Sequence, residues 1–548
     1  MTAFSDALRD ATAGLELQDR RWVYVPYDQL TDAVGPLSEM SPRDLGIVMV
    51  ESPRKAGQRP YHKQKLALVL ANGRHFALEQ ARRGVAVEHV VAVGSYAEAL
   101  GEVAARRGGL CMMEAAEREL RADLASLVTD GTLEILPHAG WLTDASDFDP
   151  QDKGPPWRMD AFYRRVRKRT GLLLDAVGKP AGGKWSHDAD NRKFWSGEPP
   201  APTPPTFEPD EITREVGELI DREFAHHPGV LDLTSLPATA DDARTQWSWA
   251  LQRCMEHFGP YEDAMSTASR TIFHTRTSAL INLHRLLPRT VVNDVANATV
   301  PLSSQEGFIR QVLGWREFVR HVHRATDGFR SVAPTRASPG DGGFERWAGW
   351  PWPGATPLAD GGASPRALGE GTPVPPAYWG TRSGMACLDT VVEGVWREGY
   401  GHHITRLMVL ANLATLLDVS PRALTDWFWV AYADAYDWVV EPNVLGMGTY
   451  AAGDVMTTKP YVSGSAYIDK MSDYCAGCAF HPKKTCPVTP LYWAFLARHT
   501  ETLSGNHRLA LIMGALRKRG DAQKRRDAAT FEAVRDALAA GELVPAAR

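Results

Sequence analysis

The chain has 548 residues, of which 44% are hydrophobic and 23% charged, and this composition indicates a globular protein with several domains. The formal net charge of −5 excludes a surface that is basic throughout, so a nucleic-acid contact requires a local basic patch. No apolar run approaches the roughly 20 residues of a membrane span. The polar residues 1–22 do not resemble a secretory signal, so we expect a cytoplasmic protein without membrane contact.

Residues 1–140 alternate short apolar segments with amphipathic ones. We expect strands at 22–27, 45–51, 85–93 and 132–137, with helices between them. Strands that alternate with helices predict an α/β domain built on a Rossmann-like, mainly parallel sheet. The sequence contains no GxGxxG motif, so this sheet is not expected to hold a standard dinucleotide site.

Three polar residues follow the first two expected strands, namely Asp28, Gln29 and Glu51. Ligands of parallel sheets bind at the carboxyl ends of the strands. These three residues are therefore candidates for binding a ligand in the N-terminal domain.

A linker is expected at 141–211, because its last part, 199–211, is rich in proline. From 212 to 548 the hydrophobic periodicity is helical, and 399–421 is apolar on nearly every side, which is typical of a helix inside a large helical domain. The segment 331–376 contains nine Pro and nine Gly among 46 residues. This composition predicts an irregular insertion that is either a lid, a binding loop or disordered.

Four of the six cysteines lie in the C-terminal third of the chain: Cys387, Cys475, Cys478 and Cys486. Cys475 and Cys478 form a CxxC pair, and Cys486 precedes a proline, as at many iron–sulfur sites. Four thiolates can hold either a [4Fe–4S] cluster or a structural zinc ion. The spacing does not choose between these groups, and unligated thiols are a third alternative.

Two histidines and two short polar runs are candidate functional groups in the helical domain. His402 and His403 are either a core pair or catalytic groups. The run 274–282 carries hydroxyls and an arginine suited to gripping a phosphate, although ordinary helix capping explains the same pattern. The run 434–443 concentrates carboxylates that need cationic or ligand partners when buried.

Two basic runs, 164–169 and 517–526, are candidate contacts for nucleic acid, and solvated helix faces explain them equally well. The 17 tryptophans are explained either by packing or by electron transfer between indoles. None of these signals decides the function separately.

The chain resembles the bacterial iron–sulfur photolyases, also called prokaryotic (6-4) photolyases, within the photolyase/cryptochrome superfamily. The matching segments in the C-terminal half are GYGHHITRLMVLANLATLL, DWFWVAYADAYDWVVEPNVLGM, TKPYVSGSAYIDKMSDYCAGC and CPVTPLYWAFLARH. Further matches are FGPYEDAM, EGFIRQVLGWREFVR, GGKWSHDADNRK and YHKQKLALVLANGRHFALE. The resemblance runs from about Trp22 to Arg526, and such a series is more specific than any single motif.

The resemblance implies an α/β antenna-type domain over 1–140, a linker over 141–211 and an all-helical FAD-binding domain over 212–548. It also implies FAD, a [4Fe–4S] cluster at the four cysteines and, in members with the usual pocket, a lumazine-type antenna chromophore near Asp28, Gln29 and Glu51. The implied FAD-binding residues are Thr275, Ser278, Asn282, Arg310, Asp437 and Asn443.

The implied activity is the repair of pyrimidine (6-4) photoproducts in damaged DNA by blue light and electron transfer from reduced FAD. His403, with His402 beside it, is implied as the proton donor. Trp379 and Trp427 are implied as carriers of electrons for flavin photoreduction. No obligatory protein partner is expected.

The sequence departs from the family in several places. Tyr27 replaces the glycine of a Gly-Asp-Gln motif and adds bulk where an antenna ring would lie. The segment 331–376 is longer than usual and lacks the family's Met-Pro-Gly-Tyr pattern. Because a fold does not fix a function, two alternatives stay open: a cryptochrome-type blue-light photoreceptor, and a flavin and iron–sulfur enzyme acting on a small molecule.

Overall fold

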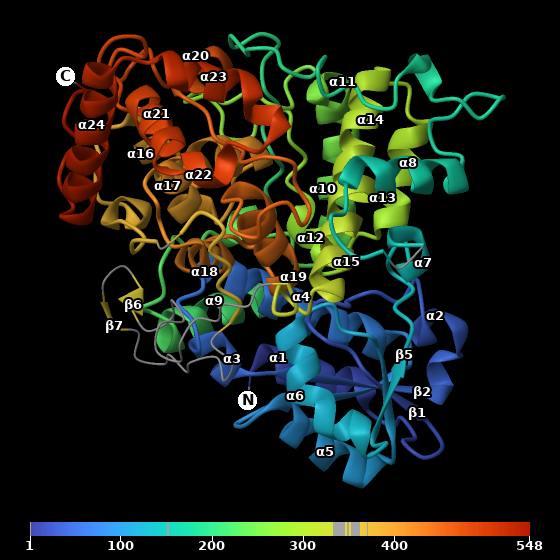
Figure 1. Cartoon of the computed structure of the whole chain (residues 1–548). Helices are drawn as coiled ribbons and strands as arrows, with labels where there is room; N and C mark the ends of the chain where they lie inside the picture. The colour runs from blue at the N-terminus through green and yellow to red at the C-terminus, as the bar shows by residue number, and fades with distance from the viewer. Residues whose placement is uncertain are drawn as a thin grey trace.

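The computed structural model describes residues 2–150, 153–332, 346–347, 350–351, 362–369 and 371–547. An α/β part at the N-terminus is followed by a larger helical part (Figure 1). In Figure 1 the sheet lies at the bottom, in blue and cyan, and the helical part lies above it. The C-terminal helix α24 (Asp521–Ala539) packs against α21 (Val488–Arg498) at the end of the molecule away from the sheet.

Five parallel strands form the sheet in the order β3-β2-β1-β4-β5. Their bounds are β1 Arg21–Tyr24, β2 Leu45–Glu51, β3 Ala86–Val91, β4 Leu110–Met113 and β5 Leu133–Leu136. The chain runs outward from β1 in one direction through β2 and β3, and in the other through β4 and β5. The crevice beyond the carboxyl ends of β1 and β4 is therefore the place where such a sheet binds ligands.

Helices cover both faces of the sheet because alternate side chains of each strand enter different cores. The helices of this part are α1 (Ala3–Thr12), α2 (Pro36–Glu39), α3 (Pro53–Gly57), α4 (Lys63–Arg82), α5 (Tyr96–Arg107) and α6 (Arg118–Thr129). Trp22 and Tyr24 of β1 share a core with α5 and α6. Val23, from the same strand, shares the opposite core with α1 and α4.

The expected fold class is confirmed, and four of the five strands were predictable. β1, β2, β3 and β5 lie at the expected segments, with β1 ending at Tyr24. β4 was not predicted: its apolar run, LCMM, is only four residues long, and so short a run does not distinguish a strand from part of a buried helix. The amphipathic helix α1 was also missed.

The helical part contains the remaining helices, which share one large core. Their bounds are α7 Ala145–Phe148, α8 Met159–Thr170, α9 Glu211–Glu223, α10 Ala240–Trp249, α11 Met255–Phe258, α12 Ser278–Asn282, α13 Pro288–Asn297, α14 Leu302–Ile309, α15 Glu317–Ala325, α16 Ala386–Glu398, α17 Asn412–Leu416, α18 Pro421–Ala431, α19 Asp437–Glu441, α20 Ser465–Met471, α22 Thr500–Leu503 and α23 Ala510–Lys518. Three π-helical segments, η5 (Arg310–Arg316), η7 (Thr405–Ala411) and η8 (Pro442–Gly448), adjoin residues implied above as functional. Such segments are frequent at functional sites.

Most of the insertion at 331–376 lies outside the described residues. The expectation that it forms a lid, a binding loop or a disordered segment falls on those residues. Its described portions include a short antiparallel pair, β6 (Arg346–Trp347) with β7 (Trp350–Pro351). Across the described helices, none combines the length and the apolar character needed to cross a bilayer. The domain boundaries expected from the sequence, at residues 140 and 211, stay predictions.

Candidate functional site

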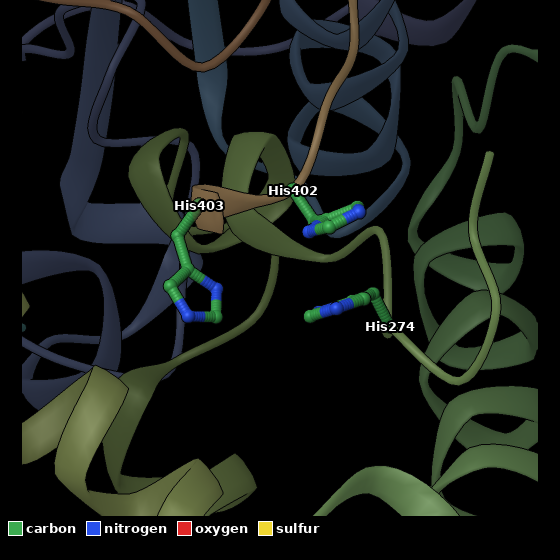
Figure 2. Close-up of side chains that lie close together, drawn as sticks. All are labelled: His274, His402 and His403. Atoms are coloured by element: carbon green, nitrogen blue, oxygen red, sulfur yellow. The ribbon is translucent and has the colours of Figure 1, made fainter. Parts of the chain in front are cut away.

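Three histidine side chains from two segments meet in the helical part (Figure 2). His402 and His403 stand where the helix leading into η7 begins, and His274 lies in the loop before α12. The imidazole rings of His274 and His402 are stacked, with centroids 4.3 Å apart and planes 9° apart. His403 meets His274 edge-on at 5.7 Å.

The stacked pair is uncharged. Burial lowers the pKa of His274 to about 3, and burial together with the neighbouring His274 lowers the pKa of His402 well below its usual value. His274 Nε2 and His402 Nδ1 are buried and make no hydrogen bond within the described part of the chain. Buried polar atoms in native proteins normally have partners, so a bound molecule is the expected partner of these two.

His403 has different surroundings, because its side chain is 37% exposed and its Nε2 lies 3.8 Å from a carboxylate oxygen of Asp263. The hydroxyl of Tyr467 donates a hydrogen bond to Asp263 over 3.0 Å. Burial raises the pKa of Asp263, but the neighbouring His403, Tyr467 and Arg192 together outweigh it, and the pKa of this carboxyl is lowered overall.

A second polar cluster is built around Asp434. Both carboxylate oxygens of Asp434 accept hydrogen bonds from Arg406, each over 2.9 Å. Ser278 donates to the same carboxylate over 2.6 Å, and the Asn282 amide donates to the Asp434 carbonyl over 2.9 Å. The Arg406 guanidinium lies over the Tyr432 ring, whose buried hydroxyl has no hydrogen bond among the described residues.

The other residues implied for FAD binding are less closely grouped. The hydroxyls of Thr275 and Thr277 lie 2.8 Å apart. Arg310, which is 6% exposed, pairs with Glu262 at 3.1 Å. Asn443 donates to a backbone carbonyl of its own helix over 2.7 Å. Their roles toward FAD stay predictions.

Asp437 lies at the junction of the two parts of the chain. Its carboxylate accepts hydrogen bonds from the backbone N–H groups of Arg118, over 2.6 Å, and Glu119, over 3.2 Å. These two residues begin α6, and Glu117, which precedes them, makes no side-chain capping bond. A carboxylate from the helical part therefore caps a helix of the α/β part.

The four cysteines line one small cavity. Cys387 comes from α16, and Cys475 and Cys478 come from the loop after α20. Cys486 lies two residues before α21 and precedes Pro487. Burial and the three other thiols raise the pKa of Cys387. Among the described residues, no three of the four sulfur atoms all lie within 4.8 Å of one another.

The two implied electron carriers both contact a third indole. Trp427 is fully buried in α18, and Trp379 is partly exposed ahead of α16. Trp396, in α16, lies 5.2 Å from Trp379 and 5.9 Å from Trp427 between ring centroids.

A cavity of about 850 Å³, its open mouth included, adjoins the carboxyl ends of β1 and β2. Tyr27, Lys65, Glu117 and Tyr436 are among its lining residues. The Tyr27 hydroxyl donates to Glu117, and its ring is stacked on Tyr436 with centroids 6.3 Å apart. The cavity therefore lies at the ligand-binding edge of the sheet, with Tyr27 inside it.

Of the three residues expected at this edge, Glu51 lines the cavity, where Arg74 donates to both of its oxygens. Asp28 and Gln29 are buried. The Asp28 carbonyl accepts from His284, and the Gln29 amide donates to the Met113 carbonyl. Whether the three residues bind a chromophore stays a prediction.

Known proteins show the same architecture and sequence pattern. Residues 23–235 match the family described as deoxyribodipyrimidine photo-lyase-related protein. Over 506 residues, or 88% of this chain and 92% of the relative, the chain is 31% identical to a (6-4) photolyase of Agrobacterium fabrum. The chain belongs to the photolyase/cryptochrome superfamily.

Solved structures of this superfamily share the fold. A bacterial class III photolyase from Agrobacterium tumefaciens matches with a TM-score of 0.50 and 14% identity, over 96% of this chain and all of the other. A cryptochrome from Synechocystis sp. PCC6803 matches with a TM-score of 0.51 and 16% identity, over 79% of this chain and 83% of the other.

Membership of the superfamily implies that the chain binds FAD. The buried polar atoms of His274, His402 and Tyr432 that have no described partner fit a ligand with many hydrogen-bonding groups. Sequence reasoning did not select His274 or Asp263, although His274 begins the run 274–282 and Asp263 lies in FGPYEDAM. It also missed Arg406 and Trp396, whose partners are distant in sequence.

Proposed function

We propose that the chain is a blue-light-driven, FAD-dependent enzyme that repairs pyrimidine (6-4) photoproducts in DNA. The observation that carries this proposal is the setting of His403, a partly exposed histidine beside an ionised carboxylate and a stacked neutral pair. The relative that is 31% identical over most of both chains is a (6-4) photolyase, which supports the same activity.

His403 is the proposed proton donor. Asp263 lies 3.8 Å from Nε2 of His403, which leaves Nδ1 on the other side of the ring to face a lesion. His274 and His402 stay neutral, so neither adds a positive charge beside the proposed donor. The exposed fraction of the His403 side chain supports access by a base flipped out of the duplex.

Ser278 and Asn282, held by the Asp434–Arg406 pair, are the proposed centre of the FAD site, with Thr275, Arg310, Asp437 and Asn443 as further members. When bound, FAD supplies the electron transfer on which repair depends. The protein positions the reacting groups, and its buried ion pairs are fixed before the substrate arrives.

The four cysteines are the proposed ligands of a [4Fe–4S] cluster. A zinc ion with Zn–S bonds of about 2.3 Å would draw its sulfur atoms close together. The wider spacing of these thiols around one cavity supports a larger group, and four cysteines are the usual ligand set of such a cluster.

The cavity beside Tyr27 is the proposed site of an antenna chromophore, of which a lumazine is one candidate. Its aromatic lining, including Tyr27 and Tyr436, supports a planar ligand. The proposed partner is damaged DNA, and the exposed Arg164 and Lys168 of α8 are candidates for contacts with its phosphates.

A repair assay tests the proposed function. Purified protein with its flavin chemically reduced is mixed with an oligonucleotide that carries one (6-4) photoproduct, with and without blue light. We expect the bases to be restored only under light. A protein that holds FAD and iron but restores no bases in light contradicts the proposal and favours a photoreceptor or a small-molecule enzyme.

A further inference from the structure

Ring nitrogens of His274, His402 and His403 gather around one small space. One nitrogen from each ring lies within 4.8 Å of the nitrogens from the other two. In Figure 2 the rings of His274 and His402 lie one above the other, and a ring nitrogen of His403 faces the edge of that pair. Imidazole nitrogens are the commonest protein ligands of metal ions. The arrangement is therefore a candidate metal site.

His274 and His402 each offer a nitrogen with no other partner. Nε2 of His274 and Nδ1 of His402 are buried and unbonded within the described ranges of the chain. The Glu262 backbone carbonyl accepts a hydrogen bond from the His274 ring, and the donor is Nδ1 because Nε2 makes no such bond. A neutral ring with its proton on Nδ1 has a lone pair on Nε2. Metal-bound histidines usually donate their other N–H to a carbonyl or carboxylate in this way.

His403 supplies a third nitrogen and opens the site to solvent. Its Nε2 lies 3.8 Å from a carboxylate oxygen of Asp263. Nδ1, on the other side of the ring, is therefore the nitrogen that faces the stacked pair. A carboxylate behind a metal-bound histidine orients the ring and raises its basicity. Because 37% of the His403 side chain is exposed, an ion can reach these nitrogens from outside.

Modest side-chain movements separate the cluster from the geometry of a zinc site. Zn–N bonds of about 2.0–2.1 Å place the nitrogens of a tetrahedral zinc ion roughly 3.3 Å apart. The planes of His274 and His402 are 9° apart, so their lone pairs run nearly parallel and one ring has to tilt toward the ion. Neither free nitrogen has a hydrogen bond to another described residue that would oppose the tilt.

We propose that His274, His402 and His403 bind a zinc ion that blocks repair by occupying the nitrogen that His403 presents to a lesion. Three imidazoles with an open fourth position are an established ligand set for zinc. The binding follows from the histidines themselves, whereas the block on repair rests on the function proposed above. The four cysteines belong to a different cavity and are no part of this site.

Equilibrium dialysis against zinc chloride tests the site, on protein that holds FAD and iron and without DNA or light. We expect one zinc ion per chain, with no loss of iron from the cysteines. Because loss of a supporting partner alone lowers metal affinity about 10–100-fold, His274→Gln should lower zinc affinity by about 10-fold or more. The matched control is His226→Gln, from an adjacent histidine pair with ring centroids 5.1 Å apart, and it should retain the affinity.

A repair assay tests the block. Zinc at a saturating concentration should lower light-driven repair of a (6-4) photoproduct by the reduced protein about 10-fold or more, and a chelator should restore it. The same zinc concentration should affect His274→Gln less, relative to that variant without zinc. Repair that is equally sensitive to zinc in both proteins would exclude these histidines as the cause.

Unchanged zinc affinity in His274→Gln would overturn the inference. Absence of zinc from the FAD-loaded protein would also overturn it, since bound FAD would then occupy the free nitrogens. If His274→Gln does not hold FAD, His402→Asn takes its place, and unchanged affinity there excludes the site. Because zinc binding is measured without DNA, a chain that binds zinc but repairs no (6-4) photoproduct would contradict the proposed function and leave the site in place.

Discussion

His403 and its two histidine neighbours show how surroundings assign different roles to identical side chains. His274 and His402 are buried, stacked and neutral, whereas His403 is partly exposed beside Asp263. Among the described residues, His403 is the member of this group that forms an ion-pair contact with a carboxylate. The sequence places two of the three histidines side by side, but the difference between them is set by the chain around them.

Replacing His403 by Ala removes the proposed proton donor. We expect repair by the chemically reduced protein to fall by about 10²-fold or more, while bound FAD, measured by absorbance, stays at the unmodified level. His507→Ala, in a short turn between α22 and α23, is the matched control. Full repair by His403→Ala would remove this residue from the chemistry.

Asp28 gives the protein a pH-dependent stability. Burial raises its pKa from 3.8 to about 7, and its Oδ1 has no hydrogen bond within the described residues. The native state therefore keeps a proton that the unfolded state releases above pH 3.8. The contribution of Asp28 to the free energy of unfolding is therefore fully favourable below that pH and is lost as the pH rises toward 7.

Asp28→Asn should remove this loss. The free energy of unfolding of the variant, relative to the unmodified protein, should increase with pH across that window by up to about 1.4 kcal/mol per pH unit. Denaturant unfolding at several pH values measures it, with the exposed Asp19→Asn as control. A difference independent of pH would show that the Asp28 carboxyl is already ionised in the native protein.

At the scale of elements, the cysteine cavity joins three segments of the helical part. One thiol comes from α16, two come from the loop after α20, and the fourth precedes α21. A group that binds the folded site but not the unfolded chain stabilises the folded state. A bound cluster is therefore expected to order these loops.

Cys475→Ala should therefore lower both the iron content and the visible absorbance of the cluster, and reduce the yield of folded protein. Iron analysis and absorbance spectra measure the effect. Cys111→Ser is the matched control, since Cys111 is buried in the sheet and donates to the Trp22 carbonyl. Unchanged iron in Cys475→Ala, or equal loss in the control, would contradict the ligand role.

At the scale of the whole molecule, the α/β part docks on the helical part through polar contacts at α6. Asp437 caps α6 from across the junction, and Arg118 of the same helix pairs with Asp327, just after α15, at 2.7 Å. The helix lacks a capping side chain of its own, so its first turn depends on the other part of the chain.

Asp437→Ala should destabilise this junction by about 1–2 kcal/mol, the usual cost of a lost helix cap. Hydrogen exchange at the amides of Arg118 and Glu119 should quicken, while exchange in β2 is unchanged. Asp437→Asn keeps an acceptor oxygen, so its exchange rates at these amides should lie between those of Asp437→Ala and those of the unmodified protein. Equal protection in Asp437→Ala would show that the junction is held by other contacts.

The sequence by itself determined the order of the elements and the residue types of the site. Short apolar runs at β1, β2, β3 and β5, separated by amphipathic segments, predict strands between helices, and the helical period predicts the larger part. The CxxC pair and the histidine pair are local in sequence, so their spacing alone marks them as candidates.

The tertiary structure decided which distant residues meet and which of them are charged. Asp263 with His403, Arg406 with Asp434, and Trp396 with Trp427 are pairs from different segments, so no local pattern connects them. Burial makes a charge costly unless it has a partner, and Arg406 is that partner for the buried Asp434. The short strand β4 also needed the sheet, since its four residues form a strand only against β1 and β5.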